Sequence, residues 1–179
     1  MIAHMLRAAF LATALLISAT IVGFAQDATP LSDAIVQQLN TAAANQTPEQ
    51  YAATVASLVK DNPTLAAAIA GRATQIRPAA AAVIAQSVAA VAPPAAAAAV
   101  VQAIVAQVPA DQKATVGATI VSNYIANAPP AAVQTIAAAL TPVLNQITAT
   151  AAGGKNSDQQ VTANQILIDT AVKSNSSPG

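Results

Sequence analysis

Two residues of this 179-residue chain have the spacing of a known catalytic motif. Ser57 and Lys60 form the pattern Ser-x-x-Lys, in which a class of serine enzymes sets a nucleophilic hydroxyl near a lysine amine. The companion patterns of that class, Ser-Asp-Asn and Lys-Thr-Gly, do not occur in the sequence. A lysine in the last turn of a helix is in any case favoured by the terminal carbonyl groups. We therefore interpret both residues as ordinary helix residues.

The side chains that bind metals or act as thiol nucleophiles are nearly missing from the sequence. It contains no Cys, and its single histidine, His4, lies close to the amino terminus. No two acidic residues lie within four positions of each other; they are Asp27, Asp33, Glu49, Asp61, Asp111, Asp158 and Asp169. We expect Asp33, Glu49 and Asp111 in the first turns of helices, where the helix dipole favours a negative charge. The sequence thus predicts no catalytic residue, no metal site, no cofactor and no enzymatic activity.

Two arginines and two tyrosines are the remaining candidates for binding. Arg72 and Arg77 lie five positions apart and could hold an anion, but two exposed cations do not make a binding patch. Tyr51 and Tyr124 could contact a ligand, whereas a tyrosine more often fills a core and keeps its hydroxyl at the rim. We expect both tyrosines in the core.

The charge distribution argues against nucleic acid as a partner. Seven basic and seven acidic residues give a net charge of 0, and only 8% of the residues are charged. The basic residues are scattered from Arg7 to Lys173, whereas phosphate binding requires clustered Lys and Arg. We expect no nucleic-acid binding.

Residues 1–25 have the three parts of a secretory signal peptide. Arg7 gives a short positive start, residues 8–22 are an uncharged and mostly apolar run, and Gly23-Phe24-Ala25 places small residues where a signal peptidase cleaves. The apolar run is shorter than the about 20 residues that a membrane-spanning helix needs. We predict cleavage after Ala25 and an exported protein, periplasmic or extracellular, without a membrane span after cleavage.

Prolines divide the rest of the chain into helix-sized segments. Four intervals, 48–63, 63–78, 78–93 and 94–109, are each 15 residues, and the residues between the prolines favour helix. A proline inside a helix costs about 3 kcal/mol, but at the first helical position it costs almost nothing. Thr29, Thr47 and Asn62 each precede a proline as capping residues, and Thr47 with Gln50 fits a capping box. The spacing predicts helices over 30–44, 48–60, 63–76, 79–91, 94–107, 110–126, 131–140 and 142–149.

The short connections between these helices require that successive helices turn back on one another. The sequence therefore predicts an all-α fold over residues 26–150, an Ala-rich array of about eight short Pro-initiated helices. The helices stack as antiparallel hairpins in a solenoid-like array or a compact bundle. The 50 alanines allow the helix axes to approach closely. Gly71 and Gly117 each stand eight residues after a proline, and we expect a tight helix crossing at both.

The composition changes after residue 150. Residues 151–160 are rich in Gly, Asn, Ser and Asp, which predicts a flexible polar linker. Residues 161–173 favour one more amphipathic helix, and residues 174–179 read as a disordered tail. Docking of the last helix onto the array is slightly favoured over a free interaction motif.

Two function classes agree with these features. The first is a non-catalytic exported protein that acts as a structural or protein-interaction helical-repeat module. The second is a carrier of a small apolar ligand or lipid in the cell envelope, suggested by 55% apolar residues and little charge. An uncharged surface of Gln, Asn, Thr and Ala favours self-association. The expected partner is a second copy or another envelope or extracellular protein.

Overall fold

The Ala-rich segments between prolines fold as helices throughout the part of the chain that the structure describes. This structure, a computed structural model, describes residues 30–151 and 158–176. Those residues form eight α-helices and four short 3₁₀ turns, and they include no β-strand. The prediction of an all-α fold is therefore confirmed. The expected signal peptide, residues 1–25, lies outside the described residues.

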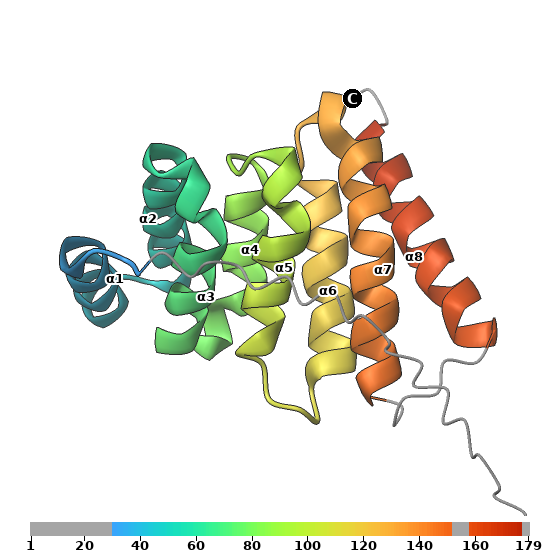
Figure 1. Ribbon diagram of the computed structural model, residues 1–179, viewed down its shortest axis with the longest axis horizontal. Coiled ribbons are helices and arrows are strands. Elements are labelled where there is room, and N and C mark those ends of the chain that lie inside the picture. The colour runs from blue at the N-terminus through green and yellow to red at the C-terminus, as the bar shows by residue number, and fades with distance from the viewer. Residues whose placement is uncertain (1–29, 152–157, 177–179) are drawn as a thin grey trace, which may run out of the picture.

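The helices pack compactly in two rows. The first row consists of α1 (Asp33–Asn45), α3 (Ala66–Ile76), α5 (Ala97–Ala106) and α7 (Val133–Ala151). The second row consists of α2 (Pro48–Asp61), α4 (Ala81–Ala89), α6 (Lys113–Ala126) and α8 (Asp158–Ser176). Each helix packs on the next member of its own row and on its chain neighbours in the other row (Figure 1). The core lies between the rows.

Side-chain caps set where the first two helices begin. The Ile35 N–H donates to Ser32 Oγ at 3.4 Å, so α1 begins at Asp33 rather than at residue 30 as predicted. Thr47 and Gln50 form the predicted capping box at the start of α2. The Gln50 N–H donates to Thr47 Oγ1 at 3.3 Å, and the Thr47 N–H donates to Gln50 Oε1 at 3.0 Å.

Four later helices begin with a proline in a 3₁₀ turn. These turns are η1 (Pro63–Leu65), η2 (Pro78–Ala80), η3 (Pro94–Ala96) and η4 (Pro130–Ala132), and they lead into α3, α4, α5 and α7. Asn62 does not cap the start of η1, because its Nδ2 donates to Leu58 O at 3.0 Å and so satisfies the end of α2. The predicted helix 79–91 ends earlier, at Ala89, and is followed by a turn in which the Val91 N–H donates to Val88 O at 3.1 Å.

The predicted break at Pro142 is absent, and the helices expected over 131–140 and 142–149 are one helix, α7. Pro142 and Ala138 are both exposed, so the carbonyl that loses its intrahelical donor lies toward solvent and can bind water. On the opposite side, Leu140 and Leu144 are fully buried, which holds both halves of α7 against the core. Burial of that apolar face outweighs the local cost of the proline.

Both glycines predicted at tight helix crossings lie at such crossings. A Cβ atom built on Gly71 in α3 would lie 3.2 Å from the Cβ of Ala103 in α5. A Cβ built on Gly117 in α6 would lie 2.7 Å from Cγ2 of Ile147 in α7. The shared offset from a proline does not mean a shared packing role, because the first crossing lies within a row and the second lies between rows.

The last helix docks on the array, as the sequence favoured, and it is longer than expected. Residues 158–160 of the expected linker and 174–176 of the expected tail are helical, whereas 152–157 and 177–179 lie outside the described residues. Ile168 and Ala171 are buried, and α8 packs on α6 and α7. Asn175 Nδ2 lies 2.8, 2.9 and 3.0 Å from the carbonyl oxygens of Ile125, Ala126 and Ala128, which share its two amide hydrogens. Its amide thereby caps the carboxyl end of α6.

Candidate functional site

The Ser-x-x-Lys pair lies on the surface of α2. Ser57 and Lys60 are both exposed, and Lys60 stands in the last turn, where a positive charge interacts favourably with the terminal carbonyls. A nucleophilic serine needs a base that is close to it and shielded from water. The position of this pair agrees with the interpretation of both as helix residues.

Tyr51 lies in the core beneath the connection between α1 and α2. Its ring is fully buried, and its hydroxyl donates to Ala73 O in α3 at 3.1 Å. The guanidinium of Arg77 lies 5.8 Å from the ring centroid, within the range of a cation–π contact. Burial raises the pKa of Tyr51 to about 12, although the charges of Arg77 and Arg72 act in the opposite direction. Tyr51 therefore ties α2 to α3 and is not placed to contact a ligand.

Tyr124 in α6 is buried as fully as Tyr51, but its hydroxyl has no hydrogen-bond partner among the described residues. Burial raises its pKa well above the usual value for tyrosine. The prediction that both tyrosines lie in the core is confirmed, whereas neither hydroxyl lies at the rim. The sequence carried no signal for the difference between the two, because it depends on which carbonyl group a neighbouring helix presents.

Arg72 and Arg77 bind different groups of the protein. Arg77 Nη1 donates to Gln46 O at 2.8 Å and holds the turn between α1 and α2. Arg72 Nη1 donates to Gln75 Oε1 within the same helix, α3. The two guanidinium groups are thus not gathered on one site for an anion.

The acidic residues remain dispersed in the fold. Asp33 and Glu49 lie in the first turns of α1 and α2, as predicted. The same prediction for Asp111 is wrong, because Pro109 begins a turn in which the Gln112 N–H donates to Pro109 O, and α6 begins only at Lys113. Within the described residues, no three His, Cys, Asp or Glu side chains come together in a way that could hold a metal ion.

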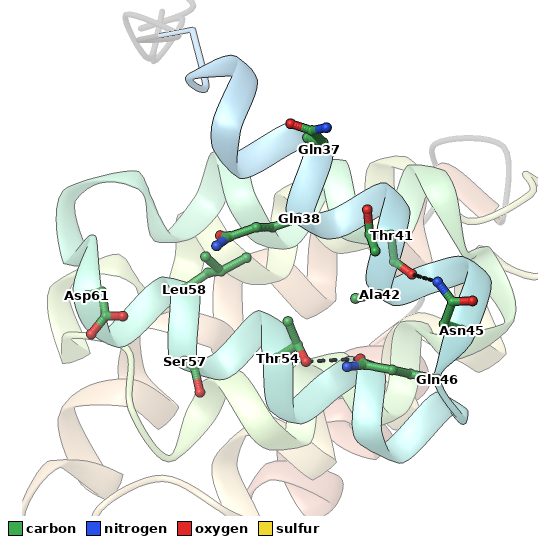
Figure 2. A pocket seen from close by; sticks show the side chains of 10 residues that line it. All are labelled: Gln37, Gln38, Thr41, Ala42, Asn45, Gln46, Thr54, Ser57, Leu58 and Asp61. Atoms are coloured by element: carbon green, nitrogen blue, oxygen red, sulfur yellow. Dashed lines mark hydrogen bonds between the residues drawn. The ribbon is translucent and has the colours of Figure 1, made fainter.

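A polar groove lies between α1 and α2 at one end of the array, with a volume of about 540 Å³ (Figure 2). From α1 and the following turn it is lined by Gln37, Gln38, Thr41, Ala42, Asn45 and Gln46. From α2 it is lined by Thr54, Ser57, Leu58 and Asp61. Most of these side chains are neutral amides or hydroxyls, so the groove offers both hydrogen-bond donors and acceptors.

Some of the groove side chains are held in place. The Thr54 hydroxyl can donate its one proton to Gln46 Oε1 at 2.9 Å or to Gln50 O, within its own helix, at 3.2 Å. Asn45 Nδ2 donates to Thr41 O at 2.9 Å (Figure 2). Gln37 and Gln38 have no partner among the described residues and are exposed. No pattern in the sequence indicates this site, because each residue alone is an ordinary polar position on the outside of a helix. Only the pairing of α1 with α2 brings the two polar faces together.

None of the helices in this described part is both long enough and apolar enough to cross a membrane. Comparison with models of known protein families, with curated proteins and with solved structures finds no match to this chain.

Proposed function

We propose that this protein is an exported, non-catalytic helical-repeat module with a structural or protein-interaction role. The observation that carries the proposal is the continuous packing of helices in two rows, in which each helix contacts the next member of its row. We interpret the rows as Pro-initiated antiparallel hairpins stacked in a solenoid-like array. Arrays of this kind bury a shared core and present long side surfaces to partners.

The two end helices of the array support this reading. Exposed polar side chains are frequent on α1, including Gln37, Asn40 and Thr41, and on α8, including Asp169 and Lys173, although Ile166 of α8 is also exposed. Terminal helices with polar outer faces stop an array from adding further helices at its ends. Binding of a partner is then left to the side surfaces and to grooves between helices.

The surface along the middle of the array, which includes the exposed side of α5, is almost uncharged, and this favours association over a free monomer. The sequence has no charged residue between Arg77 and Asp111, and the exposed part of α5 consists of residues such as Gln102 and Ala106. Without charge repulsion, such a surface favours contact with a second copy or with another exported protein.

The alternative is a carrier of a small apolar ligand or lipid. One observation favours it: a hollow of about 440 Å³ where α4 and α6 begin, lined in part by Pro78, Val108 and Val116. Against it, the largest Val, Ile and Leu side chains between the helices are fully buried against the rest of the core. A carrier site would therefore have to form at the surface rather than between the rows.

Native mass spectrometry of the protein purified from the exported fraction tests the proposal. We expect discrete oligomers or a complex with a second protein, and no bound small molecule. A monomer that carries the mass of a lipid would overturn the module in favour of the carrier. Turnover of a substrate that depends on Ser57 or Lys60 would overturn the non-catalytic assignment.

A further inference from the structure

The groove between α1 and α2 has the chemistry to recognise a polypeptide by its main chain. We propose that it binds an extended peptide segment of a partner protein, whose residues are uncharged except for one lysine or arginine placed against Asp61. This inference rests on the proposed function, because it names the partner chemistry of a module that binds proteins. It concerns one groove, whereas the module could also bind through its side surfaces.

The lining of the groove matches the groups of a peptide main chain. A peptide bond offers one N–H donor and one C=O acceptor, and a glutamine or asparagine amide offers the complementary pair at the same time. Gln37, Gln38 and Gln46 supply such amides along the groove, and the Ser57 hydroxyl can donate or accept. Leu58 and Ala42 are the apolar residues of the lining and can contact apolar side chains of the peptide.

Other ligand classes fit the same groove less well. Small apolar ligands prefer enclosed pockets, whereas this groove is open to solvent. An anion would meet no positive charge, since Asp61 is the one charged residue in the lining. A saccharide would find no aromatic ring to cover its apolar face among the lining residues, since Tyr51 is fully buried and is not one of them.

Part of the groove is arranged before any ligand binds. The Thr54 hydroxyl holds Oε1 of Gln46, and Arg77 holds the Gln46 carbonyl at 2.8 Å. The Nε2 group of Gln46 has no partner among the described residues, so it can donate to a peptide carbonyl. A side chain that is already fixed loses less conformational entropy on binding, which favours affinity.

The charge of Asp61 makes the two ends of the groove different and so favours one orientation of a bound peptide. Asp61 is the last residue of α2, is exposed, and lies at the end of the groove away from Gln46 (Figure 2). A carboxylate at one end of an otherwise neutral groove attracts one positive charge there. A peptide with a lysine or arginine at the matching end is therefore preferred over one with an acidic residue.

An NMR titration tests this inference with defined probes. The first probe is a short capped peptide of alternating alanine, serine and threonine that ends in lysine. We expect saturable shifts of the side-chain amide signals of Gln37, Gln38 and Gln46. Methylating alternate main-chain nitrogens of the peptide should weaken binding about tenfold, the equivalent of one or two net hydrogen bonds. Absence of shifts, or equal binding of the methylated peptide, would overturn the inference.

Matched variants separate the groove from the rest of the surface. Thr54→Val should weaken binding several-fold, because Gln46 loses its hydroxyl partner, whereas Thr119→Val should leave the affinity unchanged. Thr119 is a suitable control because it is exposed on α6 and its hydroxyl donates only within its own helix, to Thr115 O at 3.0 Å. An equal effect of both variants would contradict a specific role of the groove.

The charge preference has its own comparison. Asp61→Asn should lower the affinity about two- to fivefold for the lysine-ending peptide, as for an exposed ion pair, and should not change it for a peptide ending in alanine. Equal effects on both peptides would contradict the placement of the lysine of the peptide against Asp61. If native mass spectrometry finds a protein complex while the titration fails, this inference is wrong and the proposed function stands.

Discussion

The two buried tyrosines offer a test in which the same chemical change has opposite expected effects. Tyr124→Phe removes a hydroxyl that has no partner among the described residues, and it leaves the ring in place. An unsatisfied buried polar group costs about 1–3 kcal/mol. We therefore expect this variant to raise the free energy of unfolding by about 1 kcal/mol, at the lower end of that range, because the void left by the hydroxyl offsets part of the gain.

Tyr51→Phe removes a hydroxyl that donates to Ala73 O at 3.1 Å. The acceptor does not become unsatisfied, because the Arg77 N–H also donates to Ala73 O at 3.0 Å. The loss is then that of one net hydrogen bond, about 1 kcal/mol. The two variants should differ in the free energy of unfolding by about 2 kcal/mol, with opposite signs relative to the unchanged protein.

Urea unfolding at neutral pH, followed by far-ultraviolet circular dichroism, measures both changes. Equal slopes of free energy against urea would show that the variants differ in stability and not in the exposed area on unfolding. Equal losses of stability in the two variants would refute the reasoning. It would mean that the environment of the Tyr124 hydroxyl supplies a partner, such as an ordered water.

Further predictions concern pH and three other places in the fold. Both tyrosines have a pKa above the unfolded value of 10.0, so the unfolded state releases protons first and stability falls above pH 10. Each contributes a slope of about 1.4 kcal/mol per pH unit until its folded-state pKa is reached, measurable by urea unfolding at several alkaline pH values. Pro142→Ala restores an N–H donor for the Ala138 carbonyl. We expect it to raise the free energy of unfolding by about 1–2 kcal/mol, which a higher thermal midpoint would show. Gly117→Ala should destabilise the protein by about 1–3 kcal/mol, and Gly71→Ala by clearly less, because the new methyl meets a neighbour at 2.7 Å in the first and 3.2 Å in the second. Asn175→Ala should speed hydrogen exchange in α8 by about tenfold, relative to α1, because the two amide hydrogens that join α8 to the carboxyl end of α6 are lost.

Local sequence signals predicted the helix starts correctly where side chains within one turn determine where a helix begins. The capping box of Thr47 and Gln50 was predicted from two residues, because its hydrogen bonds lie within one turn. Segments between prolines were predicted as helices for a similar reason, since proline at the first position is a local preference. These rules do not depend on the rest of the molecule.

Three features were missed because packing between helices determines them. Pro142 does not end α7, because burial of Leu140 and Leu144 holds the helix together across it. The groove between α1 and α2 was not predicted, since no sequence rule states which polar faces come together. The free hydroxyl of Tyr124 was not predicted either, because its surroundings come from other helices. Each of these features needs contacts between residues far apart in the chain.

Photo-cross-linking in the producing cells tests the central claim, that this protein works by binding another protein, most directly. A photoreactive amino acid placed at Ser57 probes the groove, and one placed at Gln102 probes the exposed face of α5. We predict a discrete protein adduct from Ser57, and any adduct from Gln102 should also be protein. Adducts of lipid alone, or no adduct at either position, would contradict the account.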